Sequence, residues 1–357
     1  MKIAIDCRMS GCSGIGTFLD GILDNIISTG NEFILIGLKN KISAQNVQNV
    51  DCSVKMFSVK EMFFFPKAIR NIINTADVFF TPYCNIPCGI KVPVFSTIHD
   101  VVFLDVKGLA GKAGTLVRKF FYQRAINKSR AVITVSQFSK NRIIANLKCS
   151  KEIFVVYNGL PSYLENFTPS ETKKTDTVIF IGNIKKHKGL PVLLNAYSDF
   201  YKNMQEKNIS PKLLITGSSE NFRTKDNGVL SLIEKINSQC NSSIEFTGWV
   251  SDEKLRELLC CSKVLVQPSL YEGFGIPPLQ ALKCRTRALI SDIPVFKEIY
   301  SDLPVDFFKS EDSKDLAEKL ASSFTQTKTL PDLPEKYSYK KTAEYLLQYF
   351  NYARTDK

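Results

Sequence analysis

The chain has 357 residues, of which 44% are hydrophobic and 23% charged, a composition typical of a globular protein and a length that fits two domains better than one. No apolar run reaches the roughly 18 residues of a membrane-spanning helix, and the first six residues lack the apolar core of a signal peptide, so we expect a cytoplasmic protein. The formal net charge of +12 favours an anionic partner, whether nucleic acid, anionic lipid or a phosphorylated substrate.

Apolar runs alternate with helix-like segments along the chain, which predicts α/β domains with doubly wound parallel sheets. A first sheet is expected from Ile3–Asp6, Phe33–Gly37, Val78–Thr81, Val94–Ile98, Ala131–Val135 and Phe154–Val156. A second sheet is expected from Val178–Ile181, Lys212–Thr216, Ile244–Phe246, Val264–Gln267 and Ala288–Ser291. The polar segment 161–174, with two prolines, is predicted to link them. We therefore expect an N-terminal domain over 1–165, a C-terminal domain over 175–337, and a final helix, 338–357, that packs back on the first domain.

The ten cysteines are scattered, with no C-x-x-C pair, and His99 and His187 are the two histidines of the chain. These spacings disfavour a zinc site or a disulfide framework. We expect reduced thiols that pack as small apolar side chains.

A glycine-rich loop, Gly11-Cys12-Ser13-Gly14-Ile15-Gly16, follows the first predicted strand. Glycines let the backbone approach a ligand and leave N–H groups to bind it, so we expect a binding loop, with a plain tight turn as the alternative. The spacing differs from G-x-G-x-x-G, and the second strand ends in Leu38-Lys39 rather than in an acidic residue. Both features disfavour a nicotinamide-dependent oxidoreductase.

His99 directly follows the predicted strand Val94–Ile98. A side chain at the carboxyl end of a parallel strand faces the edge where ligands bind, and histidine can donate a hydrogen bond or relay a proton there. The alternative is a partly buried structural histidine.

Residues 106–151 include eleven basic residues and no acidic one. Leu116, Phe120 and Phe121 recur within this stretch at roughly helical spacing, which predicts a folded, basic amphipathic helix. A nucleic-acid-binding protein would place aromatic platforms between the basic residues. We expect these aromatic side chains in the core, so nucleic-acid binding remains the less favoured alternative.

The first strand of the second domain is followed by Gly182-Asn183-Ile184-Lys185-Lys186-His187-Lys188. Lysines placed just before a helix suit a diphosphate. We expect Lys188, which lies nearest the helix, to contact phosphate, and Lys185 and Lys186 to be solvated.

The segment Pro268–Leu282 places two glycines and one carboxylate where a buried strand gives way to a helix. Free N–H groups at such a junction attract phosphate, and a carboxylate accepts hydrogen bonds from sugar hydroxyls. We expect Glu272 to contact a ligand, the alternative being a helix cap. Gln280, eight residues further on, could reach the same pocket.

Taken in order along the chain, these motifs resemble the retaining glycosyltransferases of family 4, in the mannosyltransferase-like branch of the bacterial group 1 enzymes. The resemblance extends from about Lys2 to Phe350. The matching stretches are Ser96–Asp100, Val135–Ser139, Val156–Gly159, Phe180–Asn183, Phe246–Glu253 and Pro268–Pro277.

The resemblance implies a GT-B fold, in which two Rossmann-like domains face a central cleft. The first domain would hold a saccharide or polyprenyl-diphosphate-linked acceptor, and the second a nucleotide-diphosphate sugar, with mannose as the first expectation. Transfer would retain configuration, serve surface polysaccharide synthesis and need no metal or other cofactor.

The resemblance also assigns roles to individual residues. His99, Lys188 and Glu272 would act in catalysis, at the reacting sugar and its phosphate. The donor would be bound by Gly14, Gly16, Asn183, Phe274, Gly275, Ile276 and Gln280. Gln280 replaces the second glutamate of the E-x7-E signature, and His187 replaces the arginine of an Arg-Lys pair, so donor binding is expected to differ from that of other members.

The basic stretch 106–151 falls in the acceptor domain, and acceptors of such enzymes are often lipid-linked. We therefore expect Lys112, Arg118, Lys119 and Arg124 to contact anionic lipid at the inner face of the membrane. A solvated basic helix is the alternative. The run Phe63-Phe64-Phe65 is compatible with either the interface or the core.

Overall fold

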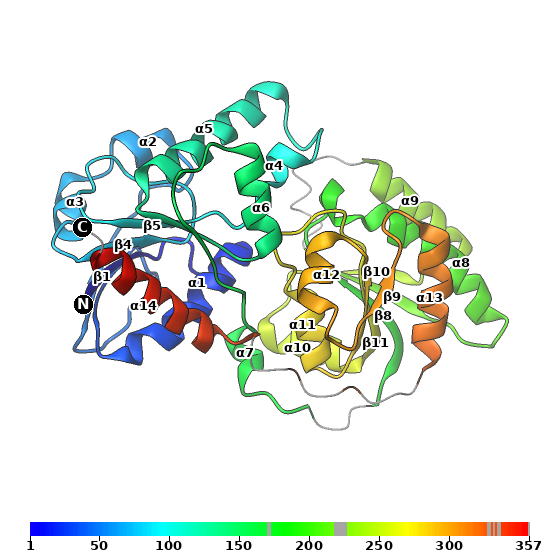
Figure 1. Cartoon of the computed structure of the whole chain (residues 1–357). Helices are drawn as coiled ribbons and strands as arrows, with labels where there is room; N and C mark the ends of the chain where they lie inside the picture. The colour runs from blue at the N-terminus through cyan, green and yellow to red at the C-terminus, as the bar shows by residue number, and fades with distance from the viewer. Residues whose placement is uncertain (170–172, 218–226, 327–329, 331–332, 334–336, 356–357) are drawn as a thin grey trace. The chain divides into compact units, whose positions relative to one another are not determined.

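A computed structural model describes residues 1–169, 173–217, 227–326, 330, 333 and 337–355. The chain divides into two compact units (Figure 1). Unit 1 consists of Met1–Ser162 and Glu335–Lys357, and unit 2 of Tyr163–Pro334. The division falls within the segment expected to be a linker, of which 170–172 lie outside the described residues.

Unit 1 is built on a seven-stranded parallel sheet. The strand order is β3 (Val47–Val50), β2 (Glu32–Ile36), β1 (Lys2–Asp6), β4 (Val78–Thr81), β5 (Val94–Thr97), β6 (Ala131–Thr134) and β7 (Ile153–Val155). The chain winds outward from β1 in one direction and from β4 in the other. The carboxyl ends of β1 and β4 therefore flank the topological switch point, where open α/β sheets bind ligands.

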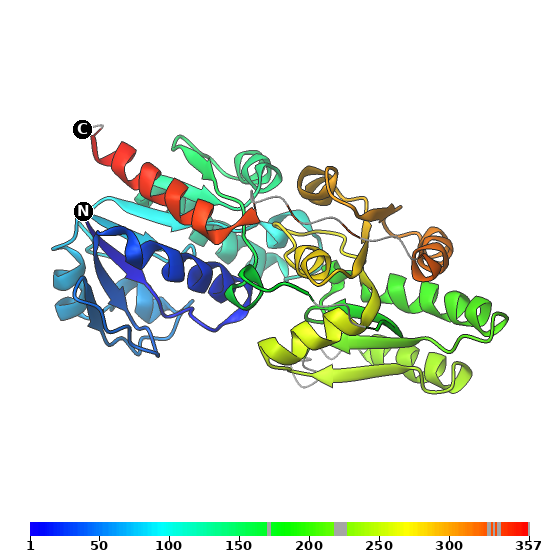
Figure 2. The ribbon, with the colours of Figure 1, turned by 90° about the horizontal axis from the view of Figure 1, so that it is seen from below.

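Helices cover both faces of this sheet (Figure 1). They are α1 (Ser13–Ile26), η1 (Ile27–Thr29), α2 (Val59–Phe63), α3 (Lys67–Ile73), α4 (Val102–Asp105), α5 (Lys112–Lys128), α6 (Gln137–Asn146) and α14 (Tyr339–Thr355). Figures 1 and 2 show α14, in red, alongside α1. The Phe350 ring of α14 lies with its centroid 4.7 Å from that of Phe95 and 5.6 Å from that of Phe80. The last helix thus supplies part of the core of unit 1.

Unit 2 repeats the same winding on a six-stranded parallel sheet. Its strand order is β10 (Ile244–Gly248), β9 (Lys212–Thr216), β8 (Thr175–Ile181), β11 (Ser262–Gln267), β12 (Arg287–Ser291) and β13 (Asp306–Phe308). Its helices are α7 (Ser162–Glu165), η2 (Lys186–Lys188), α8 (Leu190–Gln205), α9 (Asn227–Gln239), α10 (Asp252–Cys261), α11 (Pro277–Lys283), α12 (Pro294–Tyr300) and α13 (Ser313–Thr325). The switch point of this sheet lies between β8 and β11.

All eleven predicted strands are confirmed, and the described residues contain two further strands that were not predicted. The missed strands, β3 and β13, each end their sheet. β3 is only partly buried and carries Gln48 and Asn49, and β13 has three residues, so neither gives a continuous apolar run. The expectation that Phe120 lies in the core is wrong, because its side chain on α5 is exposed.

We predict that Gly21→Ala destabilises unit 1. A Cβ at Gly21 in α1 would lie 2.2 Å from the Tyr339 ring of α14, so the two helices must move apart. The overpacking cost of about 1–3 kcal/mol should exceed the ~1 kcal/mol gained in helix propensity. Gly14→Ala, on the same helix with no atom within 4 Å of the added Cβ, is the control. Urea unfolding should show a loss for the first variant and no loss for the second; equal stabilities would contradict the packing.

Candidate functional site

Two loops meet at the switch point of unit 2. One follows β8 and ends at Gly189, and the other follows β11 and begins at Pro268. Leu270 N donates to His187 O at 2.8 Å. A Cβ at Gly189 would lie 1.8 Å from Pro268 O, and Gly189 has φ +68°, so only glycine allows this close approach.

The contact between the loops brings Lys188 and Glu272 together. Lys188 Nζ lies 2.7 Å from Glu272 Oε1 and 2.8 Å from Oε2. Ser269 Oγ donates to Glu272 Oε1 at 2.7 Å, and Gln267 Nε2 donates to Ser269 Oγ at 3.0 Å. The side chains of Lys188 and Glu272 are 22% and 9% exposed, so the pair is partly open to solvent. It offers an ammonium group suited to phosphate beside a carboxylate suited to hydroxyl groups.

Ser269 and Gln267 were not predicted as site residues. Gln267 ends β11 and Ser269 follows two residues later. Their position at the carboxyl end of a strand beside the switch point could have indicated that these polar side chains belong to the site. Their hydrogen bonds orient the Glu272 carboxylate, which the sequence motif alone does not show.

His187 is buried and neutral beside this pair. Burial, together with the nearby positive charge of Lys188, lowers the pKa of His187 to about 4. Its Nδ1 has no hydrogen-bond partner among the described residues. Lys185 and Lys186 are exposed, as predicted, and Asn183 is exposed on the same loop. His187 therefore carries no charge at neutral pH.

The segment that carries Phe274, Gly275 and Ile276 is held by packing. Phe274 is buried. A Cβ at Gly275, which has φ +86°, would lie 2.4 Å from the Phe296 ring. Tyr300 donates its hydroxyl to Gly275 O. The backbone of this loop is thus fixed before any ligand binds.

Gln280 lies on α11, and its Nε2 donates to the Tyr163 hydroxyl at 2.7 Å. Both residues belong to unit 2. The structure shows no hydrogen bond from Gln280 to Glu272 or Lys188 among the described residues. Tyr163 lies within the predicted linker, 161–174, and was not singled out from the sequence.

In unit 1, the glycine loop and His99 lie at the start of α1. A Cβ at Gly16 would lie 2.5 Å from Met9 O, whereas Gly14 has open space. The His99 ring lies 5.0 Å, edge to face, from the ring of Phe18. His99 Nε2 lies 2.9 Å from Pro82 O; because a carbonyl can only accept, Nε2 carries the proton.

Burial lowers the pKa of His99 to about 4, although the hydrogen bond to Pro82 opposes the shift. His99 is therefore neutral at physiological pH, with Nδ1 as the acceptor nitrogen. His99, Gly14 and Gly16 belong to unit 1, whereas the Lys188–Glu272 pair belongs to unit 2. Within the described ranges, no three His, Cys, Asp or Glu side chains gather in a cluster suited to a metal ion.

We predict that acid destabilises the protein through its two histidines. An unfolded histidine binds a proton near pH 6.5, whereas folded His99 and His187 bind one only near pH 4. The free energy of unfolding should therefore fall between these values, by on the order of 2 kcal/mol per histidine at pH 5. Urea unfolding at pH 7 and pH 5 tests this. The double variant His99→Gln, His187→Gln should lose this part of the pH dependence, and an unchanged dependence would contradict the shifts.

The chain is similar in sequence to bacterial mannosyltransferases. It is 28% identical over 186 residues to the O-antigen chain mannosyltransferase RfbU of Salmonella typhimurium, covering 52% of this chain and 48% of RfbU. It is 24% identical over 220 residues to O-antigen chain mannosyltransferase B of Escherichia coli, covering 58% and 55%. The chain thus matches about half the length of each of these relatives.

Solved structures show the fold. Sucrose-phosphate synthase from Thermosynechococcus elongatus superposes with a TM-score of 0.71 at 13% identity, covering 99% of this chain and 98% of that one. Anabaena HepE in complex with UDP and glucose gives the same TM-score and identity, covering 99% and 100%.

Family models cover both units. The model for glycosyltransferase family 4 matches residues 15–162, and the model for glycosyl transferases group 1 matches residues 164–342, half of the chain. The chain therefore belongs to the group 1 glycosyltransferases and has the GT-B fold of two parallel-sheet α/β domains.

Proposed function

We propose that this protein is a retaining glycosyltransferase that moves a hexose from a nucleotide-diphosphate sugar to a saccharide or lipid-linked saccharide. The observation that carries the proposal is the Lys188–Glu272 pair at the switch point of unit 2. Its two relatives named as O-antigen mannosyltransferases support mannose as the sugar and surface polysaccharide as the setting. The complex of HepE with UDP and glucose supports a nucleotide-sugar donor.

In this proposal Lys188 binds the diphosphate. Its ammonium has three N–H bonds, two of which serve the oxygens of Glu272, so one remains for a phosphate oxygen. The first turn of α8 lacks a side-chain cap at Gly189, and its N–H groups add positive potential. As the nucleoside diphosphate leaves, both groups stabilise the negative charge that develops on it.

Glu272 binds the hydroxyls of the transferred sugar. Ser269 and Gln267 orient its carboxylate, which keeps the acceptor geometry fixed. His99 donates Nε2–H to Pro82, so neutral His99 offers Nδ1 to a donor hydroxyl near the reacting carbon.

The transition state has oxocarbenium character, as in other glycosyl chemistry. Following the family, we propose front-face attack, in which the departing phosphate takes the acceptor proton and configuration is retained. Lys188 and the α8 terminus supply positive charge at the leaving group, and we propose that transfer needs no metal ion.

We also propose that unit 1 contacts an anionic membrane through one surface of α2 and α5. Among the described residues, this α2–α5 surface carries large exposed apolar side chains: Phe63, Phe64, Leu116, Val117 and Phe120. Phe64 and Leu116 are 75% and 72% exposed. Exposed lysines lie on the same two helices, including Lys60, Lys112 and Lys119. Exposed apolar side chains and exposed lysines on the same two helices match a lipid interface in both polarity and charge.

Both helices contact the segment 86–88. Met62 O of α2 accepts from Cys88 N at 2.8 Å, and Arg124 of α5 donates to Ile86 O at 2.7 Å. Arg118 donates to Gly114 O and lies over the Phe103 ring. Arg118 and Arg124 thus make their contacts within unit 1. Of the four basic residues expected to contact lipid, Lys112 and Lys119 are therefore the two that are exposed. In the part of the chain that the structure covers, no helix is both long and apolar enough to cross a bilayer.

We predict that a nucleotide sugar stabilises the protein through Lys188. A thermal-shift panel of GDP-mannose, UDP-glucose and dTDP-glucose should give one clear increase in melting temperature, unchanged by EDTA. Lys188→Ala should weaken binding about tenfold or more, because a charge-assisted hydrogen bond contributes about 1.5–3 kcal/mol. Lys186→Ala, in the same turn but exposed, is the matched control. Stabilisation by NAD or by a single-stranded oligonucleotide, and by no nucleotide sugar, would overturn the proposal.

We predict that the protein sediments with phosphatidylglycerol vesicles and not with phosphatidylcholine vesicles. The double variant Phe64→Ser, Leu116→Ser should bind at least about tenfold more weakly, because burying such a side chain contributes roughly 1.5–3 kcal/mol. Trp249→Ser, which removes an 83% exposed side chain in unit 2, is the control. Equal binding by the double variant and the control would exclude the α2–α5 surface.

A further inference from the structure

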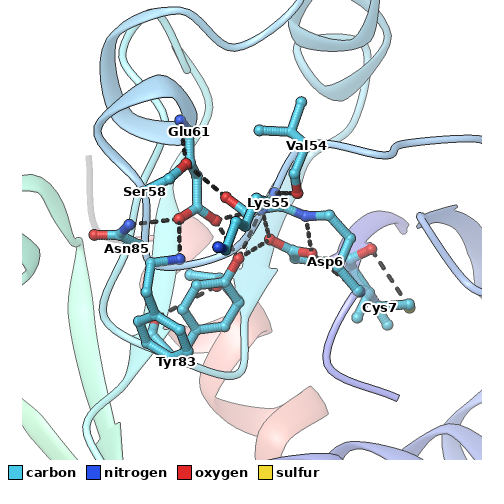
Figure 3. Close-up of polar contacts among 12 residues, drawn as sticks. Asp6, Cys7, Val54, Lys55, Ser58, Glu61, Tyr83 and Asn85 are labelled. Carbon is cyan, nitrogen blue, oxygen red and sulfur yellow. Dashed lines mark hydrogen bonds and ion pairs between the residues drawn. The ribbon is translucent and has the colours of Figure 1, made fainter. Parts of the chain in front are cut away.

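A buried ionic network occupies the switch point of unit 1 (Figure 3). Asp6 ends β1, Arg8 follows it, and Tyr83 and Asn85 follow β4. Glu61 joins them from α2. Each of these five residues is at most 5% exposed. The mechanism proposed above assigns none of them a contact with substrate.

Arg8 is the one cation of this cluster. Its Nε lies 2.9 Å from Asp6 Oδ1, and its Nη2 lies 2.6 Å from Asp6 Oδ2 and 2.7 Å from Glu61 Oε1. The same Nη2 lies 2.7 Å from the Tyr83 hydroxyl, and Nη1 donates to Val54 O at 3.0 Å. Two carboxylates thus share one guanidinium group, and burial raises the pKa of Glu61.

Glu61 connects the network to the segment after β4. Ser58 caps α2 by accepting from Glu61 N at 3.1 Å, which fixes the backbone of Glu61. Its Oε1 accepts from the Tyr83 hydroxyl, and its Oε2 accepts from Asn85 Nδ2. Phe57 N also donates to Oε2, at 2.8 Å. One carboxylate therefore holds two residues of the same short loop.

This loop contains the hydrogen-bond partner of His99. Pro82 directly precedes Tyr83, and Pro82 O accepts from His99 Nε2. On the other side of the network, Arg8 directly precedes Met9, whose carbonyl packs against Gly16. Through the adjacent residues Pro82 and Met9, the network is thus connected to both elements of unit 1 that the sequence predicts to face the donor.

Stability alone does not account for such a network. Burying each ion costs several kcal/mol, and well-packed apolar side chains of similar volume can often replace a buried ion pair without loss of stability. Hydrogen bonds are directional, so a hydrogen-bonded network places a loop more precisely than apolar packing does.

We propose that Glu61 and Tyr83 are positioning residues that hold the Pro82 carbonyl and so keep His99 in the Nε2–H tautomer. The importance of this tautomer for transfer rests on the proposed function, whereas the tautomer itself does not. Because a neutral histidine has one protonated nitrogen, holding the proton on Nε2 keeps Nδ1 available as an acceptor. The network would thereby set which atom His99 presents to a sugar hydroxyl.

The test is ¹⁵N spectroscopy of the imidazole rings in the full-length protein at pH 7. The chain has two histidines, so His187→Gln assigns the signals of His99. In the wild type, His99 should be in the Nε2–H tautomer. In Tyr83→Phe and in Glu61→Gln, a substantial fraction, tens of per cent, should shift to the Nδ1–H tautomer. Tyr197→Phe in unit 2, which removes a buried hydroxyl bonded to Pro211 O at 2.8 Å, should leave His99 unchanged.

The measurement separates positioning from simple loss of stability. If both variants lower the melting temperature and His99 keeps the wild-type tautomer, the proposal is wrong. Tyr83→Phe retains the aromatic ring, so it decides the question if Glu61→Gln does not fold. Where a donor is identified, both variants should lower kcat several-fold with a smaller change in KM. Absence of donor binding in the wild type would refute the proposed function and leave the tautomer result standing.

Discussion

Each of the two sheets reverses its strand order beside its first strand, and this topology brings together the Lys188–Glu272 pair in unit 2 and the network around Arg8 in unit 1. In unit 2 the reversal brings the loops after β8 and β11 together, so that Lys188 meets Glu272 across 84 residues of sequence. In unit 1 the same reversal joins the ends of β1 and β4, where Asp6, Arg8 and Tyr83 meet. Parallel strands leave their carboxyl ends at one edge, so both clusters follow from the winding of the chain.

The two clusters differ in their access to solvent and therefore in the chemistry open to them. The Lys188–Glu272 pair is partly exposed, so each partner can exchange its bond for one to a ligand. The network of unit 1 is buried, so it can influence a ligand only by fixing the positions of neighbouring residues. His99 and His187 are both neutral at physiological pH, and Lys188 is the cation paired with Glu272. In the proposed mechanism, the positive charge at the leaving phosphate therefore comes from Lys188 and the α8 terminus rather than from a histidine.

Sequence patterns predicted what is local or apolar, and missed what depends on distant polar partners. The central strands were predictable because they are continuous buried runs, whereas the edge strands β3 and β13 lack that signal. Lys188 and Glu272 were expected to bind ligand because each follows a strand. The network around Arg8 was not expected, because Glu61 and Tyr83 lie 53 and 75 residues from Arg8 in the sequence. The sequence around Glu61 indicates only a helix cap, in which Glu61 is the fourth residue of an S-x-x-E motif. Phe120 was expected in the core but is exposed. Helical spacing shows that apolar side chains share one face of a helix, but it does not show whether that face is buried.

The last helix has a consequence for how the protein is made. Unit 1 is built from both ends of the chain, and the Phe80 and Phe95 rings of its sheet are covered by Phe350 of α14. During synthesis the first 162 residues emerge without that cover, and unit 2 emerges complete before it arrives. An apolar face of the sheet therefore stays open until α14 has been synthesised. Nascent chains of this protein should therefore need chaperone protection for longest over residues 1–162, which are made before unit 2 and α14.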